Sequence, residues 1–205
     1  MATVASQSSP RSARRREELL ASIVDLFLDE GFLEFGIGDL ATRLRCSRST
    51  LYVVAASKEQ IVLAALRHFF RNAAARIEEK VANEPDLGAR LSVYLRAVAE
   101  ELAPAEPAFY RDLAAYVPGR EIYAENIRYA SDRVGRLVAD AVEAGQMRPV
   151  AADFVGSAVS AVMASIQSGD VRQRTGMDDA EAYAALADLV LEGLKAEDGD
   201  RREHR

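Results

Sequence analysis

Helical periodicity is the feature that most constrains this chain. Apolar residues recur at steps of three and four from near the start of the sequence to near its end, and no stretch alternates apolar and polar residues as a half-buried strand would. The first such segment, residues 14–30, carries the pattern in residues such as Ile23 and Phe27. It stops at Gly31, a residue suited to the left-handed backbone that ends many helices. The pattern predicts an all-α protein.

Proline and glycine divide this pattern into about nine helices. Proline disfavours helical backbone at the residue before it, and serine or aspartate often caps a helix start. Ser57-Lys-Glu-Gln60, for example, has the spacing of a capping box. We expect helices over residues 14–30, 37–44, 47–54, 57–82, 86–102, 105–116, 120–145, 152–173 and 178–196.

Charge separates the chain into two parts. Residues 1–72 hold ten Lys/Arg against eight Asp/Glu, a net +2, whereas residues 73–205 hold sixteen against twenty-four, a net −8. Such asymmetry favours two functional halves, although a basic terminus is often only a solvated tail. We expect four segments: a disordered basic arm (1–13), a first helical unit (14–72), a larger second unit (73–196) and a disordered polar tail (197–205).

The two short helices expected at 37–44 and 47–54, joined by a tight break, have the pattern of a helix-turn-helix. The second is polar on its outward face, with Arg48, Ser49 and Thr50 near its start. The major groove of DNA is about 12 Å wide and admits one helix, from which arginine can bind guanine and hydroxyls can reach phosphates. The first unit is therefore predicted to bind DNA.

Lys58 falls in the first turn of the next expected helix. Main-chain amides and the helix dipole favour an anion there, so a positively charged lysine is unfavourable by itself. Its presence is explained if the lysine and the main-chain amides bind the same phosphate group. The alternative is a solvent-facing lysine beside Glu59.

The span Arg14–Phe70 resembles the DNA-binding domain of TetR-family transcriptional regulators. The matching residues are Ile23, Phe27, Gly31, Phe32, Asp39, Leu40, Ala41, Ser47, Thr50, Leu51, Tyr52, Ser57, Lys58 and Glu59. The resemblance implies a homodimer, a C-terminal ligand-sensing domain, and DNA contacts from the positions of Thr50, Tyr52 and Lys58.

The sequence departs from the family pattern at three places. Val54 and Ala55 stand where the family usually has histidine and phenylalanine, Phe35-Gly36 where it has a threonine cap, and Arg45 where it has the turn glycine. We therefore expect DNA affinity to depend more on the basic arm and Arg45. The predicted DNA-contacting residues are Arg14, Arg15, Arg45, Ser47, Arg48, Ser49, Thr50, Tyr52 and Lys58. The alternative is a helical ligand- or protein-binding module whose degenerate helix-turn-helix no longer binds DNA.

The last two long helices carry wide apolar stripes, and the first of them is rich in small residues that allow close helix packing. In TetR-like proteins these helices form a four-helix dimer interface. The predicted interface residues are Ser157, Ala161, Ala164, Ser165, Leu186 and Val190. The alternative is a core within one chain, since helical stripes usually mean core.

Aromatic residues of the second unit could line an apolar cavity with a few hydroxyls, as ligand sites do. The predicted ligand-binding residues are Tyr94, Phe109, Tyr110, Tyr116, Tyr123 and Met163, for a small and largely apolar effector. Each of them could instead belong to the core or the surface.

The main alternative to a DNA-binding regulator is an enzyme. The chain has two histidines, neither with a second ligand at metal spacing, and its one cysteine, Cys46, has no histidine near it in sequence. Glycine-rich phosphate loops are absent too, so we expect no catalytic residue, metal or cofactor. The sequence also lacks a secretory signal and any run of about 18 apolar residues. We expect a cytoplasmic, ligand-responsive repressor that acts as a homodimer on operator DNA.

Overall fold

The computed structural model describes residues 10–195, which form ten helices and no strand. The helices are α1 (Pro10–Glu30), α2 (Ile37–Arg43), α3 (Arg48–Leu51), α4 (Lys58–Ala82), α5 (Leu87–Leu102), α6 (Pro107–Ala115), α7 (Val117–Glu143), α8 (Ala152–Gln167), α9 (Asp170–Thr175) and α10 (Asp179–Leu194). The predicted all-α class is confirmed. No helix in this range is long and apolar enough to cross a membrane.

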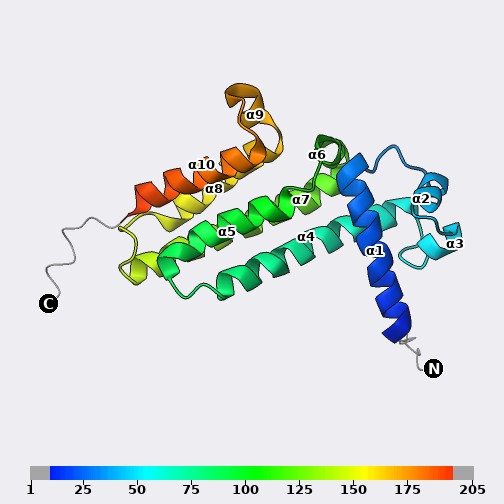
Figure 1. The fold of residues 1–205 in the computed structure, drawn as a ribbon, viewed down its shortest axis with the longest axis horizontal. Coiled ribbons are helices and arrows are strands. Elements are labelled where there is room, and N and C mark those ends of the chain that lie inside the picture. The colour runs from blue at the N-terminus through cyan, green and yellow to red at the C-terminus, as the bar shows by residue number, and fades with distance from the viewer. Residues whose placement is uncertain (1–9, 196–205) are drawn as a thin grey trace, which may run out of the picture.

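The molecule is elongated (Figure 1). α1, α2 and α3 form one end, and α4 runs from that end along the length of the molecule. α5, α7, α8 and α10 complete the other part, from which α9 projects (Figure 1). α4 therefore belongs to both parts, as the sequence predicts for residues 57–82.

Two apolar cores lie along this axis. The larger one joins α4, α5, α7, α8 and α10. The other joins α1 to α4 but also takes in Phe109 and Leu113 from α6 and Ile122 from α7. The helix α6 thus packs into the core of the first unit, although its sequence position lies well beyond the expected boundary at residue 72.

Two helix starts differ from expectation. α1 begins at Pro10, so residues 10–13 are helical rather than part of a disordered arm, and Arg14 and Arg15 lie on the helix. The remainder of that arm and the expected tail (197–205) lie outside the described residues. α7 begins at Val117, three residues early, because Pro118 occupies its first turn, where a missing N–H costs nothing.

Two expected helices are interrupted. The helix expected over 152–173 divides into α8 and α9 at Gly169, whose φ of 82° is left-handed. The helix expected over 47–54 is one α-helical turn, α3, followed by tighter bonds from the Val53 amide to the Thr50 carbonyl (3.1 Å) and from the Val54 amide to the Leu51 carbonyl (2.9 Å). The result is ten helices rather than about nine.

Candidate nucleic-acid interface and ligand cavity

α3 is short and is fixed at its start by a side-chain cap. The Ser47 hydroxyl accepts a hydrogen bond from the Thr50 amide (3.1 Å) and lies 2.7 Å from the Ser49 hydroxyl and 2.8 Å from the Thr50 hydroxyl. Such a cap stabilises a helix by about 0.5–2 kcal/mol. Ser47, predicted as a DNA contact, therefore has a structural role in this turn.

The end of this element is held by α1. The Val54 side chain is buried, and the Arg16 guanidinium donates to the Val54 carbonyl oxygen (3.2 Å). Valine thus stands buried where the family pattern has a histidine, and the Arg16 side chain ties α1 to the end of the α3 turn.

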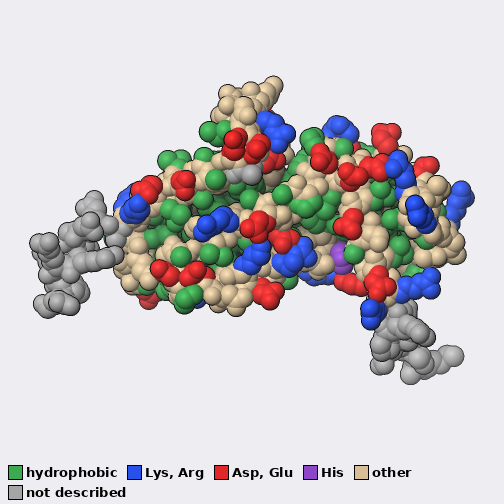
Figure 2. All heavy atoms as spheres, in the orientation of Figure 1, with side chains coloured by type: hydrophobic (Ala, Val, Ile, Leu, Met, Phe, Trp, Pro, Cys, Tyr) green, Lys and Arg blue, Asp and Glu red, His purple; other side chains and the backbone are tan. Residues whose placement is uncertain are grey.

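The outward surface of the turn and α3 is polar and exposed. Arg45, Arg48, Ser49 and Tyr52 are exposed there, and Thr50 is half-buried. Figure 2 shows lysine and arginine side chains at this end of the molecule, with acidic side chains among them. Most of the predicted DNA-contacting residues of this segment are therefore open to solvent.

Arg45 and Arg48 are constrained by the backbone near them. Arg45 has φ 50°, and among the described residues it is the one non-glycine with positive φ, as expected where the family has glycine. The Arg48 guanidinium lies against α2, 3.0 Å from the place where a β-carbon on Gly38 would stand. A side chain at Gly38 would displace it.

Lys58 lies behind this surface. Its ammonium group donates to the Leu33 carbonyl oxygen (2.8 Å), in the loop between α1 and α2, and the side chain is half-buried. A phosphate bound by Lys58, as predicted, would have to share the ammonium group with the Leu33 carbonyl. The alternative, a solvent-facing lysine, does not fit a half-buried side chain. Arg14 and Arg15 are exposed on α1, where Arg14 pairs with Glu18 (2.8 Å).

The start of α2 has no side-chain cap at Gly36 but keeps the reciprocal bond of a capping box. Asp39, three residues into the helix, accepts the Gly36 amide hydrogen (2.9 Å). The Arg43 guanidinium lies over the Phe35 ring, 5.8 Å from its centre, and also pairs with Glu30 on α1. The sequence signal for the Gly36–Asp39 bond was an aspartate three positions after Gly36, and we did not predict this bond.

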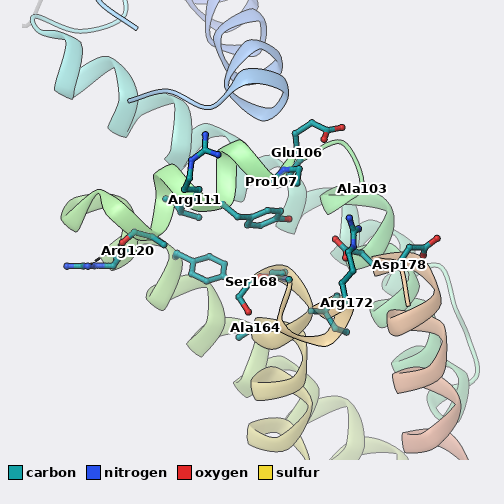
Figure 3. A pocket seen from close by; sticks show the side chains of 18 residues that line it. Ala103, Glu106, Pro107, Arg111, Arg120, Ala164, Ser168, Arg172 and Asp178 are labelled. Atoms are coloured by element: carbon teal, nitrogen blue, oxygen red, sulfur yellow. Dashed lines mark hydrogen bonds and ion pairs between the residues drawn. The ribbon is translucent and has the colours of Figure 1, made fainter. Parts of the chain in front are cut away.

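A cavity of about 880 Å³ lies between α6, α7, α8, α9 and α10 (Figure 3). Its walls include Tyr110 and Leu113 from α6, Tyr123 from α7, and Ile166 and Gln167 from α8. A smaller cavity, about 70 Å³, lies between α4, α5, α7 and α8 and shares Tyr123 and Gln167 with the first.

The structure divides the predicted ligand-binding residues into three groups. Tyr110 and Tyr123 line the large cavity, whereas Tyr94 and Met163 line the small one. Phe109 and Tyr116 are corrections: their rings meet the Phe32 ring edge-on, at 6.1 and 6.0 Å between centres, and pack into the core of the first unit. Helical periodicity cannot distinguish a ring that faces a cavity from one that faces a neighbouring core.

A chain of hydrogen bonds separates the two cavities. The Tyr123 hydroxyl donates to the Gln167 side-chain oxygen, and the Gln167 amide group donates to the Tyr183 hydroxyl (2.8 Å). Burial raises the pKa of both tyrosines well above the usual value, so both phenols stay protonated. Gln167 was missed in the sequence, where one glutamine at the end of an apolar helix is an ambiguous signal.

Charged side chains form part of the cavity lining: Glu106, Arg111, Arg120, Arg172, Asp178 and Asp179. Arg111 and Arg120 point away from its middle (Figure 3). Arg172 pairs with Asp179 at 3.0 Å, so these two charges offset each other at the rim. The lining therefore combines apolar side chains with neutral hydrogen-bonding groups and charges of both signs.

The outer face of α8 and α10 carries exposed apolar side chains. Phe154 and Leu189 are each 73% exposed and Val162 is 40% exposed. Among the predicted interface residues, Ser157 and Ala161 are exposed and Ser165 and Val190 are half-buried, but Leu186 is buried in the core of its own chain and Ala164 lines the large cavity. Leu186 and Leu189 lie only about 60° apart around α10, so the edge of the buried stripe runs between them.

The sequence matches no protein-family model and no curated protein. Solved structures are similar along almost the whole chain. A TetR-family regulator from Agrobacterium tumefaciens superimposes with a TM-score of 0.69 at 19% identity, covering 90% of this chain and 100% of that one. A TetR-family regulator from Cytophaga hutchinsonii gives 0.71 at 15% identity, covering 93% and 100%.

A third similar structure is a putative transcriptional regulator from Saccharomonospora viridis in complex with choline, with a TM-score of 0.73 at 19% identity, covering 91% of this chain and 100% of that one. At these identities the similarity shows the fold. The fold expected from the resemblance is therefore confirmed.

Proposed function

We propose that this chain, which has the fold of TetR-family transcriptional regulators, is a sequence-specific DNA-binding regulator that acts as a homodimer and releases operator DNA when an effector occupies the large cavity. The observation that carries the proposal is the exposed polar surface of α3 and its turn, with Arg45, Arg48, Ser49 and Tyr52 at one end of an elongated molecule. Two such surfaces in a dimer would read two half-sites in successive major grooves.

The first test is selection of genomic DNA fragments on the purified protein, followed by footprinting over a salt series. We expect a protected palindrome and a steep loss of affinity with salt, because phosphate contacts release counterions. If no fragment is retained even at low salt, the alternative applies, a helical binding module without DNA. The use of Ser47 as a cap and of Lys58 in a loop contact is the observation that favours this alternative.

Substitutions in α3 and its turn test the interface. Arg48→Gln is expected to reduce operator affinity by about 1–3 kcal/mol and to relax specificity at one base pair, as loss of an arginine–guanine contact does. Tyr52→Phe removes only a hydroxyl from a side chain that is 48% exposed, so it should weaken binding to all sequences alike without changing the fold.

The matched control is Arg174→Gln, an exposed arginine on α9, far from α3 in Figure 1. Affinity can be measured by fluorescence anisotropy on the selected fragment. Equal affinity of Arg48→Gln, Tyr52→Phe and the control would place the DNA contacts elsewhere.

The dimer is assigned to the outer face of α8 and α10, because exposed apolar residues of this kind mark interaction sites. Leu189→Glu places a charge at the most exposed leucine of this face and should convert the dimer to a monomer, seen by sedimentation velocity. A monomer binds one half-site, so operator affinity should fall strongly. Val117→Glu, at a valine that is 54% exposed on α7, is the control and should leave a dimer. A dimeric Leu189→Glu protein would refute this interface.

A further inference from the structure

A buried carboxylate joins the cavity helix α6 to the DNA-binding end. Asp112 is 6% exposed, and its Oδ2 atom accepts hydrogen bonds from the amides of Phe32 (2.6 Å) and Leu33 (2.9 Å). These bonds span about 80 positions of sequence. Hydrogen bonds to an ionised acceptor are roughly twice as strong as neutral ones, so this is a firm link between two distant segments.

Gly31 makes the link possible in two ways. Its φ of 79° ends α1 in the left-handed region, so that the next two amides point the same way, as in other anion-binding nests. A β-carbon on Gly31 would lie 2.5 Å from Asp112 Oδ2. Close packing against the carboxylate therefore excludes a side chain at this position, apart from the backbone angle.

The loop that receives Asp112 is also bonded to α4. The Leu33 carbonyl accepts the Lys58 ammonium group (2.8 Å), and Lys58 is the first residue of α4, directly after α3 and its turn. A continuous path thus leads from Asp112 through the Phe32–Leu33 backbone to Lys58, beside the surface assigned to DNA.

α6 lies between that path and the large cavity. Tyr110, Arg111 and Leu113, its residues on either side of Asp112, line the cavity, whereas Phe109 packs on Phe32. A second backbone bond, from the Glu106 amide to the Leu28 carbonyl (2.9 Å), ties the start of α6 to α1. α6 has nine residues and is set off from α5 by residues 103–106 and from α7 by Tyr116.

From this geometry we infer that Asp112 is a positioning residue that transmits occupancy of the large cavity to the helix-turn-helix. An occupant displaces α6, the Asp112 carboxylate moves with it, and the Phe32–Leu33 loop and Lys58 shift the start of α4 and α3. The inference rests on the proposed function, and it assigns a role in regulation to one buried side chain.

The test uses a bulky side chain as the occupant. Ala164 on α8 lines the cavity opposite α6 (Figure 3), and Ala164→Phe fills part of it. Two measurements are made on the full chain: amide hydrogen exchange of the segment containing Phe32 and Leu33, and affinity for the selected operator. Each is repeated with Asp112→Ala, which removes the carboxylate, and with Asp112→Asn, which keeps its shape and remains usable if the alanine variant fails to fold.

With Asp112 present, Ala164→Phe should speed exchange at the Phe32–Leu33 segment and change operator affinity roughly fivefold or more, the lower end of usual allosteric coupling. With Asp112→Ala the same substitution should change both by less than about twofold, and Asp112→Asn should lie between. Asp132→Asn, an exposed aspartate on α7, should behave like the unsubstituted protein.

Equal effects of Ala164→Phe with and without Asp112 would overturn the inference. It would also be overturned if Ala164→Phe had no effect on exchange or affinity with Asp112 present while the protein still bound the operator. Exchange needs no DNA, so the two proposals can fail separately. An Asp112-dependent change in exchange without any operator would support the link and reject the proposed function.

Discussion

Gly156→Ala is expected to lower the free energy of unfolding by about 3 kcal/mol or more, at the upper end of the cost of overpacking a core. A β-carbon on Gly156 would stand 2.4 Å from the Ser131 carbonyl oxygen and 3.1 Å from the Gly135 amide nitrogen. Both atoms belong to the backbone of α7, so no side chain can swing aside and the two helices must separate. At about 2–4 °C per kcal/mol for a chain of this size, the melting temperature should fall by roughly 6–12 °C.

Gly193→Ala is the matched control for this prediction. Gly193 also lies in a helix, α10, but a β-carbon there would meet no atom within 4 Å. Alanine favours helix over glycine by up to about 1 kcal/mol, so this variant should be as stable as the parent or slightly more so. Both are compared by thermal unfolding at one protein concentration, since a dimer's stability depends on concentration. Equal stability of the two variants would mean that α7 and α8 do not approach this closely.

The sequence predicted the fold wherever a local pattern carries the information. The apolar repeat of α1 and its end at Gly31 are such patterns, and both were predicted. The repeat says which side of a helix is buried but not which core receives it. α6 was therefore placed with the second unit, whereas its Phe109 and Leu113 complete the core of the first.

The same limit applies to the candidate site. An exposed polar set at α3 and its turn follows from residue type and helical spacing, and Arg48, Ser49 and Tyr52 are exposed there. That they contact DNA stays a prediction. Asp112 was not found, because its partners are backbone amides about 80 positions away and an aspartate on an amphipathic helix ordinarily faces solvent. Lys58 was assigned to a phosphate because the sequence cannot show that the Leu33 carbonyl lies within its reach.

Phe109→Ala is expected to destabilise the protein by about 3–5 kcal/mol, the usual cost of emptying a buried aromatic site. The Phe109 ring is 1% exposed and lies 5.8 Å from the Phe69 ring and 6.1 Å from the Phe32 ring, centre to centre. Because these partners come from α4 and from the loop after α1, the loss falls on the core shared by α1 to α4 as well as on α6.

Tyr110→Phe is the control, since it keeps the neighbouring ring and removes only a hydroxyl at the cavity wall. For that hydroxyl no hydrogen-bond partner is recorded among residues 10–195, so its removal should leave the melting temperature almost unchanged. Thermal unfolding of both variants without any ligand separates the two roles proposed for this pair: a core ring matters to the empty protein, whereas a ligand contact matters only when the cavity is filled. A Phe109→Ala protein with the parent's melting temperature would return Phe109 to the list of ligand contacts. That result would also contradict the packing of α6 into the core of the first unit.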